Sequence, residues 1–340
     1  MRRIRVLLAD DSQTILNALS ALLKDEVDIE VVGRATDGVE AVSLAKTLRP
    51  DVITMDVMMP RLDGLGATAA IMAEAPARVL IVSSLTETQM DLSFRAIEAG
   101  ALELISKPKT SGLDDLRKWG RRVAESIRLM AEVPVITRRR LATLPDQMPR
   151  TRVAPVDIFG IVASTGGPPA LALLLGALPA KLPVPILIAQ HITEGFTGGL
   201  VRWLSAVCPL KVAIAQDGKV AMPGEVYLAP DGHHLELDGE GVMRCVRHTT
   251  GHCPSGNRLL SSLARAYGAR AGGVVLTGMG DDGAQGLLDI RNAGGQTFAQ
   301  DAASSVVFGM PQAAYQMKAT QMLLPLEAMA PMIRELAEHR

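Results

Sequence analysis

A serine, a histidine and an aspartate in the second half of the chain could form a proton relay. Each follows a short apolar run that is typical of a buried strand: Ser164, His191 and either Asp281 or Asp282. The carboxyl ends of neighbouring parallel strands share one edge of a sheet, so these side chains could meet there. A serine beside an imidazole can act as a nucleophile, and an aspartate can orient the imidazole and stabilise its charged form.

The residues after Ser164 predict a sharp turn into a helix. The sequence Ser164-Thr165-Gly166-Gly167 is followed by Pro168 and Pro169, which favour the first turn of a helix. Such a turn aims backbone N–H groups at one point, which suits an oxyanion or a phosphate. The order serine, histidine, aspartate is not that of the α/β-hydrolases, and 163–167 is not their Gly-x-Ser-x-Gly. A separately built triad is therefore expected.

A dinucleotide-binding loop is the rival interpretation of the same region. Residues 278–283 have the pattern Gly-x-Gly-x-x-Gly between a predicted strand and a predicted helix, and Asp301 ends the next strand about 20 residues on. However, Asp281 and Asp282 occupy the loop where a pyrophosphate would lie, and like charges disfavour its binding. This interpretation also leaves Ser164 and His191 unexplained.

The first third of the chain carries an acidic cluster. Asp10 and Asp11 end the first predicted strand, Asp56 the third, Ser83 the fourth and Lys107 the fifth. Carboxylates this close repel one another unless a hard cation bridges them, and Mg²⁺ is the natural partner. A lysine and a hydroxyl beside them can bind the oxygens of a phosphoryl group carried by an aspartate. Capping of the first helix would explain only the first two acids.

Short apolar runs alternate with longer amphipathic segments and predict two α/β domains. Five βα units in the first predict a five-stranded, parallel, doubly wound sheet. The second is expected to be a doubly wound, mostly parallel α/β domain with antiparallel hairpins within Glu225–His248. The expected strands are 4–10, 30–35, 51–56, 78–84 and 101–107, then 158–163, 185–190, 211–215, 273–277 and 296–300.

A basic, proline-bearing segment between the two stretches is typical of a linker. The expected boundaries are 1–122 for the first domain, 123–155 for the linker and 156–340 for the second domain. An amphipathic helix is expected at Leu326–His339.

The composition bounds the class of protein. The 340 residues are 48% hydrophobic, 21% charged and 3% aromatic, with a net charge of −1, so no global field favours binding to nucleic acid or anionic lipid. No apolar run reaches the roughly 20 residues that span a bilayer, and no secretory signal is recognisable. A soluble, cytoplasmic protein without direct membrane insertion is expected, and its three cysteines are expected to be free thiols.

A second group of possible metal ligands is judged differently. Cys245, His248, His252 and Cys253 are close in sequence, but their spacing fits no common structural zinc site, so metal binding is not expected there. His233 and His234 follow an Asp-Gly turn and are expected to be exposed or to support a loop.

The first 120 residues or so resemble the receiver domain of two-component response regulators. The resemblance rests on four elements in order: 10–11, 55–60, 82–84 and 107–108. It implies a flavodoxin-like fold, Asp56 as the phospho-acceptor, Asp10 and Asp11 on the metal side, Ser83 as the switch hydroxyl and Lys107 as the salt-bridge partner. It also suggests a cis peptide bond before Pro108. One departure is Leu104, where receivers often have an aromatic residue.

The rest of the chain resembles the chemotaxis methylesterase CheB family. The matching motifs are 163–167, 190–191 with 196–197, 276–283, and 299–301 with 306–311. The sequence departs from the family at Ile192-Thr193, commonly Met-Pro, and at Gly256-Asn257, commonly Val-Asp.

The resemblance implies a phosphorylation-regulated protein-glutamate methylesterase that acts on chemoreceptors and can deamidate receptor glutamines. Ser164 would be the nucleophile, His191 the base and Asp282 the third member, with the backbone N–H groups of Met279 and Thr165 at the oxyanion. Methylated chemoreceptors would be the substrate and a chemotaxis histidine kinase the phosphodonor, with Mg²⁺ at the receiver and no cofactor at the esterase site. The alternatives are a dinucleotide-binding enzyme fused to a receiver, and a response regulator without enzymatic activity.

Overall fold

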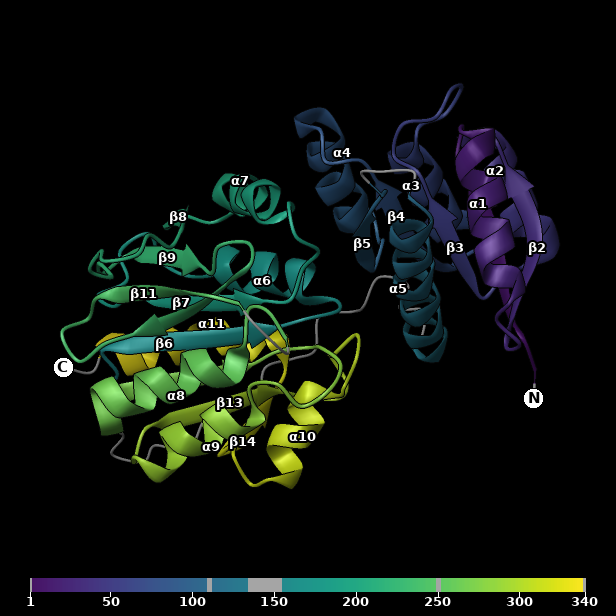
Figure 1. Cartoon of the computed structure of the whole chain (residues 1–340). Helices are drawn as coiled ribbons and strands as arrows, with labels where there is room; N and C mark the ends of the chain where they lie inside the picture. The colour runs from purple at the N-terminus through teal and green to yellow at the C-terminus, as the bar shows by residue number, and fades with distance from the viewer. Residues whose placement is uncertain (1, 109–111, 134–154, 249–251, 339–340) are drawn as a thin grey trace. The chain divides into compact units, whose positions relative to one another are not determined.

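The computed structural model describes residues 2–108, 112–133, 155–248 and 252–338. The chain divides into two compact units, 1–140 and 141–340, each with its own core (Figure 1). Within the described ranges, no helix combines the length and apolar composition that crossing a membrane requires.

The first unit is a five-stranded parallel sheet with helices on both faces, as the sequence predicted. The strand order is β2-β1-β3-β4-β5, and every neighbouring pair is parallel. The strands are β1 (Ile4–Ala9), β2 (Ile29–Ala35), β3 (Val52–Met55), β4 (Arg78–Ser83) and β5 (Glu103–Ser106); the helices are α1 (Gln13–Lys24), α2 (Gly38–Leu48), α3 (Gly64–Glu74), α4 (Glu87–Glu98) and α5 (Leu113–Glu132).

Local sequence signals fix where these helices begin. Ser12, Asp37 and Asp63 cap α1, α2 and α3, because each side chain accepts a hydrogen bond from a backbone N–H in the first turn. Three of the five strands are mostly apolar: β3 is buried at all four positions, and β1 and β4 are buried along most of their length. Runs of this kind are expected where helices cover both faces of a sheet.

The last helix of this unit corrects the expected domain boundary. α5 continues to Glu132, ten residues past the boundary expected at 122. Val123, Ile127 and Met130 are buried in the core of the first unit at helical spacing. Residues 123–132 are therefore part of this unit, and most of the expected linker, 134–154, lies outside the described residues.

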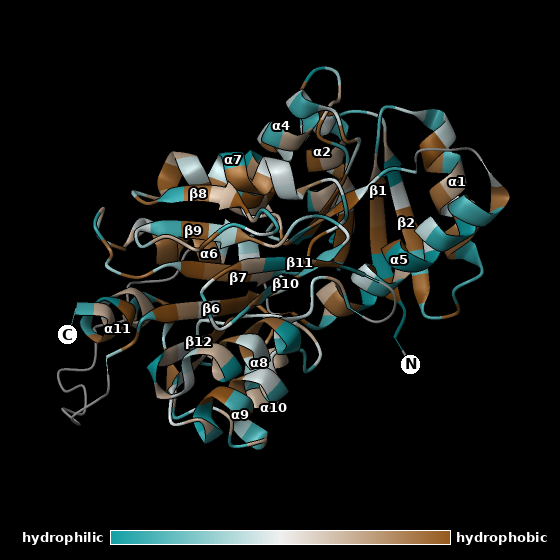
Figure 2. Cartoon of the chain, turned by 60° about the vertical axis from the view of Figure 1, so that its left-hand side comes forward, coloured by the Kyte–Doolittle hydropathy of each residue, from teal (hydrophilic) through white to brown (hydrophobic). Residues whose placement is uncertain are grey.

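The second unit is built on a seven-stranded sheet of order β14-β13-β12-β6-β7-β9-β8, parallel throughout. The strands are β6 (Ile158–Ala163), β7 (Ile186–Gln190), β8 (Lys211–Ile214), β9 (Glu225–Leu228), β12 (Ala271–Val275), β13 (Gln296–Gln300) and β14 (Met322–Leu324). In Figure 2, β6 and β7 are coloured as hydrophobic along most of their length, and all their residues are buried.

Helices cover both faces of this sheet. The group α6 (Gly167–Gly176), α7 (Thr197–Val207) and α11 (Leu326–Glu338) lies on one face, and α8 (Gly256–Tyr267), α9 (Ala284–Asn292) and α10 (Met310–Gln316) lie on the other (Figure 1). A short 3₁₀ helix, η1 (Gly268–Arg270), precedes β12. The amphipathic helix expected at the C-terminal end is confirmed as α11.

The segment Glu225–His248 differs in part from the expectation. Only β10 (His233–Leu237) and β11 (Met243–Arg247) form an antiparallel hairpin, whereas β9 joins the main sheet parallel to β7 and β8. Val226, Tyr227 and Leu228 are buried, as an inner strand requires.

The winding of the second sheet creates a switch point beside β6. From β6 the chain moves to β7 and then to the outer pair β8 and β9, and it returns to β12 on the other side of β6. The loops after β6 and β12 therefore leave the same edge of the sheet toward opposite faces. Open α/β sheets bind their ligands at such points.

Candidate functional site

The acidic cluster of the first unit forms as the sequence predicted it. Asp10 follows β1, Asp56 follows β3 and Lys107 follows β5, so one edge of the sheet holds all three. The Lys107 Nζ lies 2.8 Å from Oδ2 of Asp10 and 3.0 Å from Oδ2 of Asp56. The exposed Asp11 borders this group, and the Ser12 N–H donates to Oδ1 of Asp10. One ammonium thus faces two buried carboxylates.

Burial dominates the electrostatics of this cluster. Desolvation raises the pKa of Asp56 to about 6, because the lowering effect of Lys107 does not compensate for it and Asp10 adds repulsion. Desolvation also raises the pKa of Asp10, against hydrogen bonding and attraction from Lys107. Burial alone would lower the pKa of Lys107, but the two carboxylates reverse this and raise it. The ionised cluster is therefore short of positive charge.

The donor set fits a hard divalent cation. One oxygen from each of Asp10, Asp11 and Asp56 can be chosen so that all three lie within 4.8 Å of one another. Oδ1 of Asp56 is buried and has no hydrogen-bond partner among the described residues. Oxygen ligands of this kind are those that Mg²⁺ takes.

Ser83, Leu104 and Pro108 are the other residues of this unit that the sequence singled out. Ser83 is buried at the end of β4, and its Oγ donates to the carbonyl of Ser84 at 3.3 Å. Leu104 is buried in β5. Among the described residues the only cis peptide bond precedes Pro254, so the bond before Pro108 is trans and the expectation there is wrong. The trans form is the lower-energy isomer of an X–Pro bond.

In the second unit, paired strands bring Ser164 and His191 to one edge. Ala163 pairs with Gln190 in the register of β6 and β7, so the residue after each strand lies beside the other. The His191 N–H donates to the Ala163 carbonyl at 2.8 Å. Gln190 bridges the loops that follow β6 and β7. Its Nε2 donates to the carbonyls of Ser164, at 2.9 Å, and of His191, at 2.8 Å. Gln190 is buried, so this bridge is shielded from solvent.

The loop after β12 completes this group. The Ser164 N–H donates to the Thr277 carbonyl, and a Cβ added at Gly278 would come within 2.6 Å of the Ser164 Cβ. Glycine is therefore required at 278 by the close approach of the serine loop.

The structure distinguishes the two aspartates of the β12–α9 loop. Asp281 is exposed, whereas Asp282 is buried and its Oδ2 lies 2.9 Å from Nε2 of His191. The imidazole thus uses Nε2 toward the carboxylate, which leaves Nδ1 as the nitrogen that can accept a proton.

Asp282 lies at the N-terminus of α8. The N–H groups of Gly256 and Asn257 donate to its two oxygens at 2.6 and 2.9 Å, and the Ser255 Oγ donates at 3.1 Å. Burial alone would raise the pKa of Asp282, but the hydrogen bonds from His191, Asn257 and Gly256 outweigh it and lower the pKa to about 2. The N-terminal end of a helix favours negative charge, so this carboxylate stays ionised.

Sequence reasoning missed the residues that hold Asp282. Serine at position 255 is a typical N-cap residue, which was a signal for the start of a helix. It could not indicate the hydrogen bond to Asp282, which lies 27 positions away. Asn257 has a second role, because its Oδ1 accepts from the N–H groups of Gly283 and Gly286 at the start of α9. The departure from the family at residue 256 also has a reason, since a Cβ there would lie 2.3 Å from a side-chain carbon of Val162.

These contacts exclude the dinucleotide interpretation. A pyrophosphate would need the free N–H groups at the start of α9, but the Asn257 side chain already binds two of them. Asp301 accepts from the backbone N–H and the Oγ of Ser304, so it is bound within its own loop.

The histidines and cysteines near α8 are arranged differently from the expectation. His234 is only 3% exposed, and its Nδ1 accepts a hydrogen bond from the Ser255 N–H, so of the two expected alternatives it supports a loop rather than being exposed. It groups with His248 and Cys253, without Cys245 or His252. His252 instead stacks on His191, with ring centroids 5.5 Å apart and an interplanar angle of 11°.

Comparisons with known proteins agree with this architecture. The response regulator receiver domain model matches residues 6–118, and the CheB methylesterase model matches residues 159–333. The chain is 60% identical over 334 residues to "Protein-glutamate methylesterase/protein-glutamine glutaminase 3" of Myxococcus xanthus, which covers 98% of this chain and 93% of that protein. A protein of the same name from Anaeromyxobacter dehalogenans is 44% identical, with 92% of each chain covered.

A solved structure is similar to the second unit. The catalytic domain of Thermotoga maritima CheB methylesterase is 33% identical, with a TM-score of 0.51, and the match covers 53% of this chain and 98% of that chain.

Proposed function

We propose that this chain, which belongs to the CheB methylesterase family and carries a receiver domain ahead of its esterase domain, hydrolyses glutamate methyl esters on chemoreceptors. The full-length relatives, whose names state this activity, support the proposal. The observation that carries the chemistry is the 2.9 Å contact between His191 and a buried carboxylate, at the sheet edge that also holds Ser164.

The proposed acylation step uses Ser164, His191 and Asp282. The Ser164 Oγ attacks the ester carbonyl while Nδ1 of His191 takes its proton, and Asp282 stabilises the imidazolium through Nε2. The imidazolium then protonates the departing methoxide, which leaves as methanol. Because the pKa of Asp282 is about 2, the carboxylate remains charged throughout.

The backbone around the pocket supports an oxyanion site. The N–H groups of Thr165 and Met279 have no hydrogen-bond partner among the residues that the structure describes. Both belong to the loops that meet at Ser164. We assign them as donors to the oxygen of the tetrahedral intermediate, where fixed donors stabilise developing charge without reorganisation.

Hydrolysis of the acyl-enzyme completes the reaction. His191 takes a proton from water, the resulting hydroxide attacks the acyl carbon, and the proton returns to the Ser164 Oγ as it leaves. The same residues can deamidate a receptor glutamine, in which case ammonia departs in place of methanol. These steps assign no cofactor to the esterase site.

The receiver is proposed to regulate the esterase through phosphorylation of Asp56. A chemotaxis histidine kinase would be the phosphodonor, and these partners place the reaction in the cytoplasm. Mg²⁺ held by Asp10, Asp11 and Asp56 would offset the charge of the incoming phosphoryl group. Lys107 and Ser83 would bind its oxygens, and the 3.0 Å contact of Lys107 with Asp56 supports the first of these roles.

Release of methanol from methylated receptor, with and without a small phosphodonor, tests the proposal. Ser164→Ala should abolish nearly all turnover and leave the thermal unfolding temperature unchanged, because only one hydroxyl is removed. Asp56→Asn should keep basal turnover but lose the response to the phosphodonor. Substantial turnover by folded Ser164→Ala would refute the nucleophile assignment, and full activation of Asp56→Asn would refute the regulatory one.

A further inference from the structure

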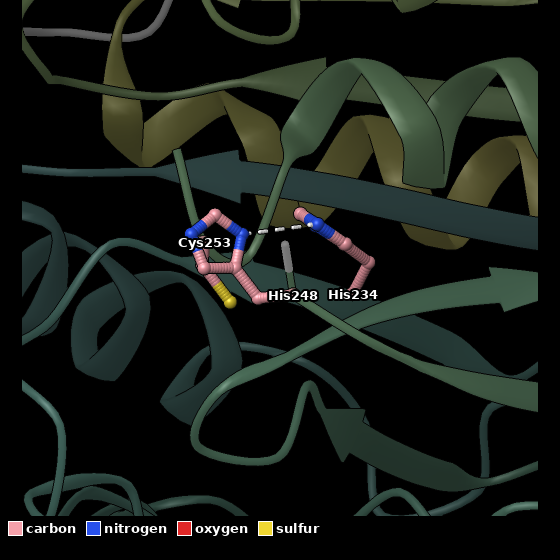
Figure 3. A group of neighbouring side chains, drawn as sticks. All are labelled: His234, His248 and Cys253. Atoms are coloured by element: carbon pink, nitrogen blue, oxygen red, sulfur yellow. Dashed lines mark hydrogen bonds between the residues drawn. The ribbon is translucent and has the colours of Figure 1, made fainter. Parts of the chain in front are cut away.

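His234, His248 and Cys253 form a compact group of nitrogen and sulfur donors. One donor atom from each can be chosen so that all three lie within 4.8 Å of one another (Figure 3). His234 lies near the start of β10 and His248 directly follows β11, so both are at the open end of this hairpin, and Cys253 comes from the segment that leads into α8. His234 is buried, and the other two are half-buried, so the group is partly accessible to solvent.

The distance between the two histidines suits a shared metal better than a direct bond. Nδ1 of His248 and Nε2 of His234 are 3.4 Å apart, the pair joined by the dashed line in Figure 3. Hydrogen bonds between such groups are usually shorter, at about 2.7–3.2 Å. Two imidazole nitrogens at about 2.0–2.1 Å from a tetrahedral Zn²⁺ are about 3.3 Å apart.

We infer that His234, His248 and Cys253 form a binding site for a thiophilic divalent cation such as Zn²⁺, with one coordination position open to solvent. Two imidazoles and a thiolate are ligands that Zn²⁺ prefers over Mg²⁺. The carboxylates of Glu194 and Asp231 act electrostatically on Cys253, and their negative charge favours a cation there. Burial, and to a smaller extent these same charges, raise the pKa of the Cys253 thiol, so the metal must displace its proton on binding.

A metal bound at this site would affect the residues at the N-terminus of α8 that bind Asp282. In the structure the Ser255 N–H donates to Nδ1 of His234 at 3.1 Å, so the proton of the neutral ring is on Nε2. A metal at Nε2 moves that proton to Nδ1, where it faces the Ser255 N–H. The Ser255 backbone must then shift, although its Oγ and the next N–H, of Gly256, both bind Asp282.

The cation is therefore expected to inhibit the esterase. The proton balance is one proton released per metal ion bound, from Cys253, since the His234 proton only changes nitrogen. The effect on turnover rests on the proposed triad, whereas binding of the metal does not. The two can be measured separately.

Metal binding is tested on the full chain, reduced with a phosphine and freed of metal by a chelator. Titration with Co²⁺ should give one thiolate-to-metal charge-transfer band per chain, which Zn²⁺ displaces. Cys253→Ser should lose the band and bind Zn²⁺ at least about tenfold more weakly, since even changes outside the ligand shell cost about 10–100-fold. Cys245→Ser is the matched control and should keep both, because Cys245 is outside the group.

Inhibition is tested by the release of methanol at one equivalent of Zn²⁺. Turnover of the wild type and of Cys245→Ser should fall and recover with chelator, whereas Cys253→Ser should be unaffected. Absence of the band in the wild type, or its persistence in Cys253→Ser, would overturn the site. Full turnover with the site occupied, or equal inhibition of Cys253→Ser, would overturn the coupling to Asp282.

Discussion

Replacing Asp56 by asparagine should stabilise the receiver unit at neutral pH. The Asp56 side chain is only 2% exposed, and burial with repulsion from Asp10 raises its pKa from 3.8 to about 6 in spite of Lys107. The ionised carboxylate is thus a net cost to the folded state. Asparagine keeps the shape of the side chain and removes the charge.

The magnitude follows from the shift of about two pKa units. At 1.36 kcal/mol per unit, the cost of the ionised form is about 3 kcal/mol, an upper value for a group coupled to Lys107 and Asp10. Because the pKa is raised in the folded state, there is no penalty below pH 3.8, where both states are protonated. The penalty grows as the pH rises from 3.8 to about 6 and is complete above that.

Urea unfolding with a chelator present measures this effect. In a Trp203→Phe background the remaining tryptophan is Trp119, a core residue of the receiver unit, so its fluorescence follows that unit. Asp56→Asn should raise the free energy of unfolding by up to about 3 kcal/mol at pH 7, with the gain vanishing near pH 4. Exposed Asp25→Asn, the control, should change it by less than about 0.5 kcal/mol. Equal stability of Asp56→Asn and its parent at pH 7, or a gain that does not depend on pH, would refute the reasoning.

Three further substitutions test the esterase site. Asp282→Asn should lower turnover by about 10⁴-fold, since an amide cannot hold the imidazole in the same tautomer; unchanged methanol release would contradict the triad. Gln190→Leu should cost about 1–3 kcal/mol in chemical denaturation and lower turnover, because two carbonyls lose their donor; unaltered stability and turnover would argue against the bridge. His252→Ala should lower kcat by up to about tenfold through loss of the stacked ring, and His252→Phe should restore it; equal rates for both would show that stacking on His191 does not matter.

Most strands of the two main sheets could be predicted, because they are mostly apolar runs. The pairing of the inner strand β9 was less visible. Nothing local distinguishes β9 from the hairpin that follows it, since parallel pairing with β7 and β8 is set by distant segments. The end of α5 was signalled by the spacing of Val123, Ile127 and Met130, but the basic, proline-bearing composition of the following segment masked it.

The residues of the candidate esterase site could also be predicted only in part. The positions of Ser164 and His191 follow from strand ends, which the sequence reveals. The choice of Asp282 over Asp281 came only from the family resemblance, because burial decides it in the fold. The grouping of His234 with His248 and Cys253 could not be predicted, because these residues are 14 and 19 positions away along the chain.

The contacts that position Asp282 form only when the second unit is folded, so the proposed esterase activity depends on that folding. The carboxylate is carried by the β12–α9 loop, but besides His191 the groups that bind it lie at the N-terminus of α8, 25 to 27 positions earlier in the chain. A molecule in which α8 has come away from that loop would retain its serine and its histidine and yet lack an oriented base. If Asp282 acts as proposed, newly made or partly unfolded chains would not cleave esters indiscriminately, and docking of α8 would complete the core and the proposed triad together.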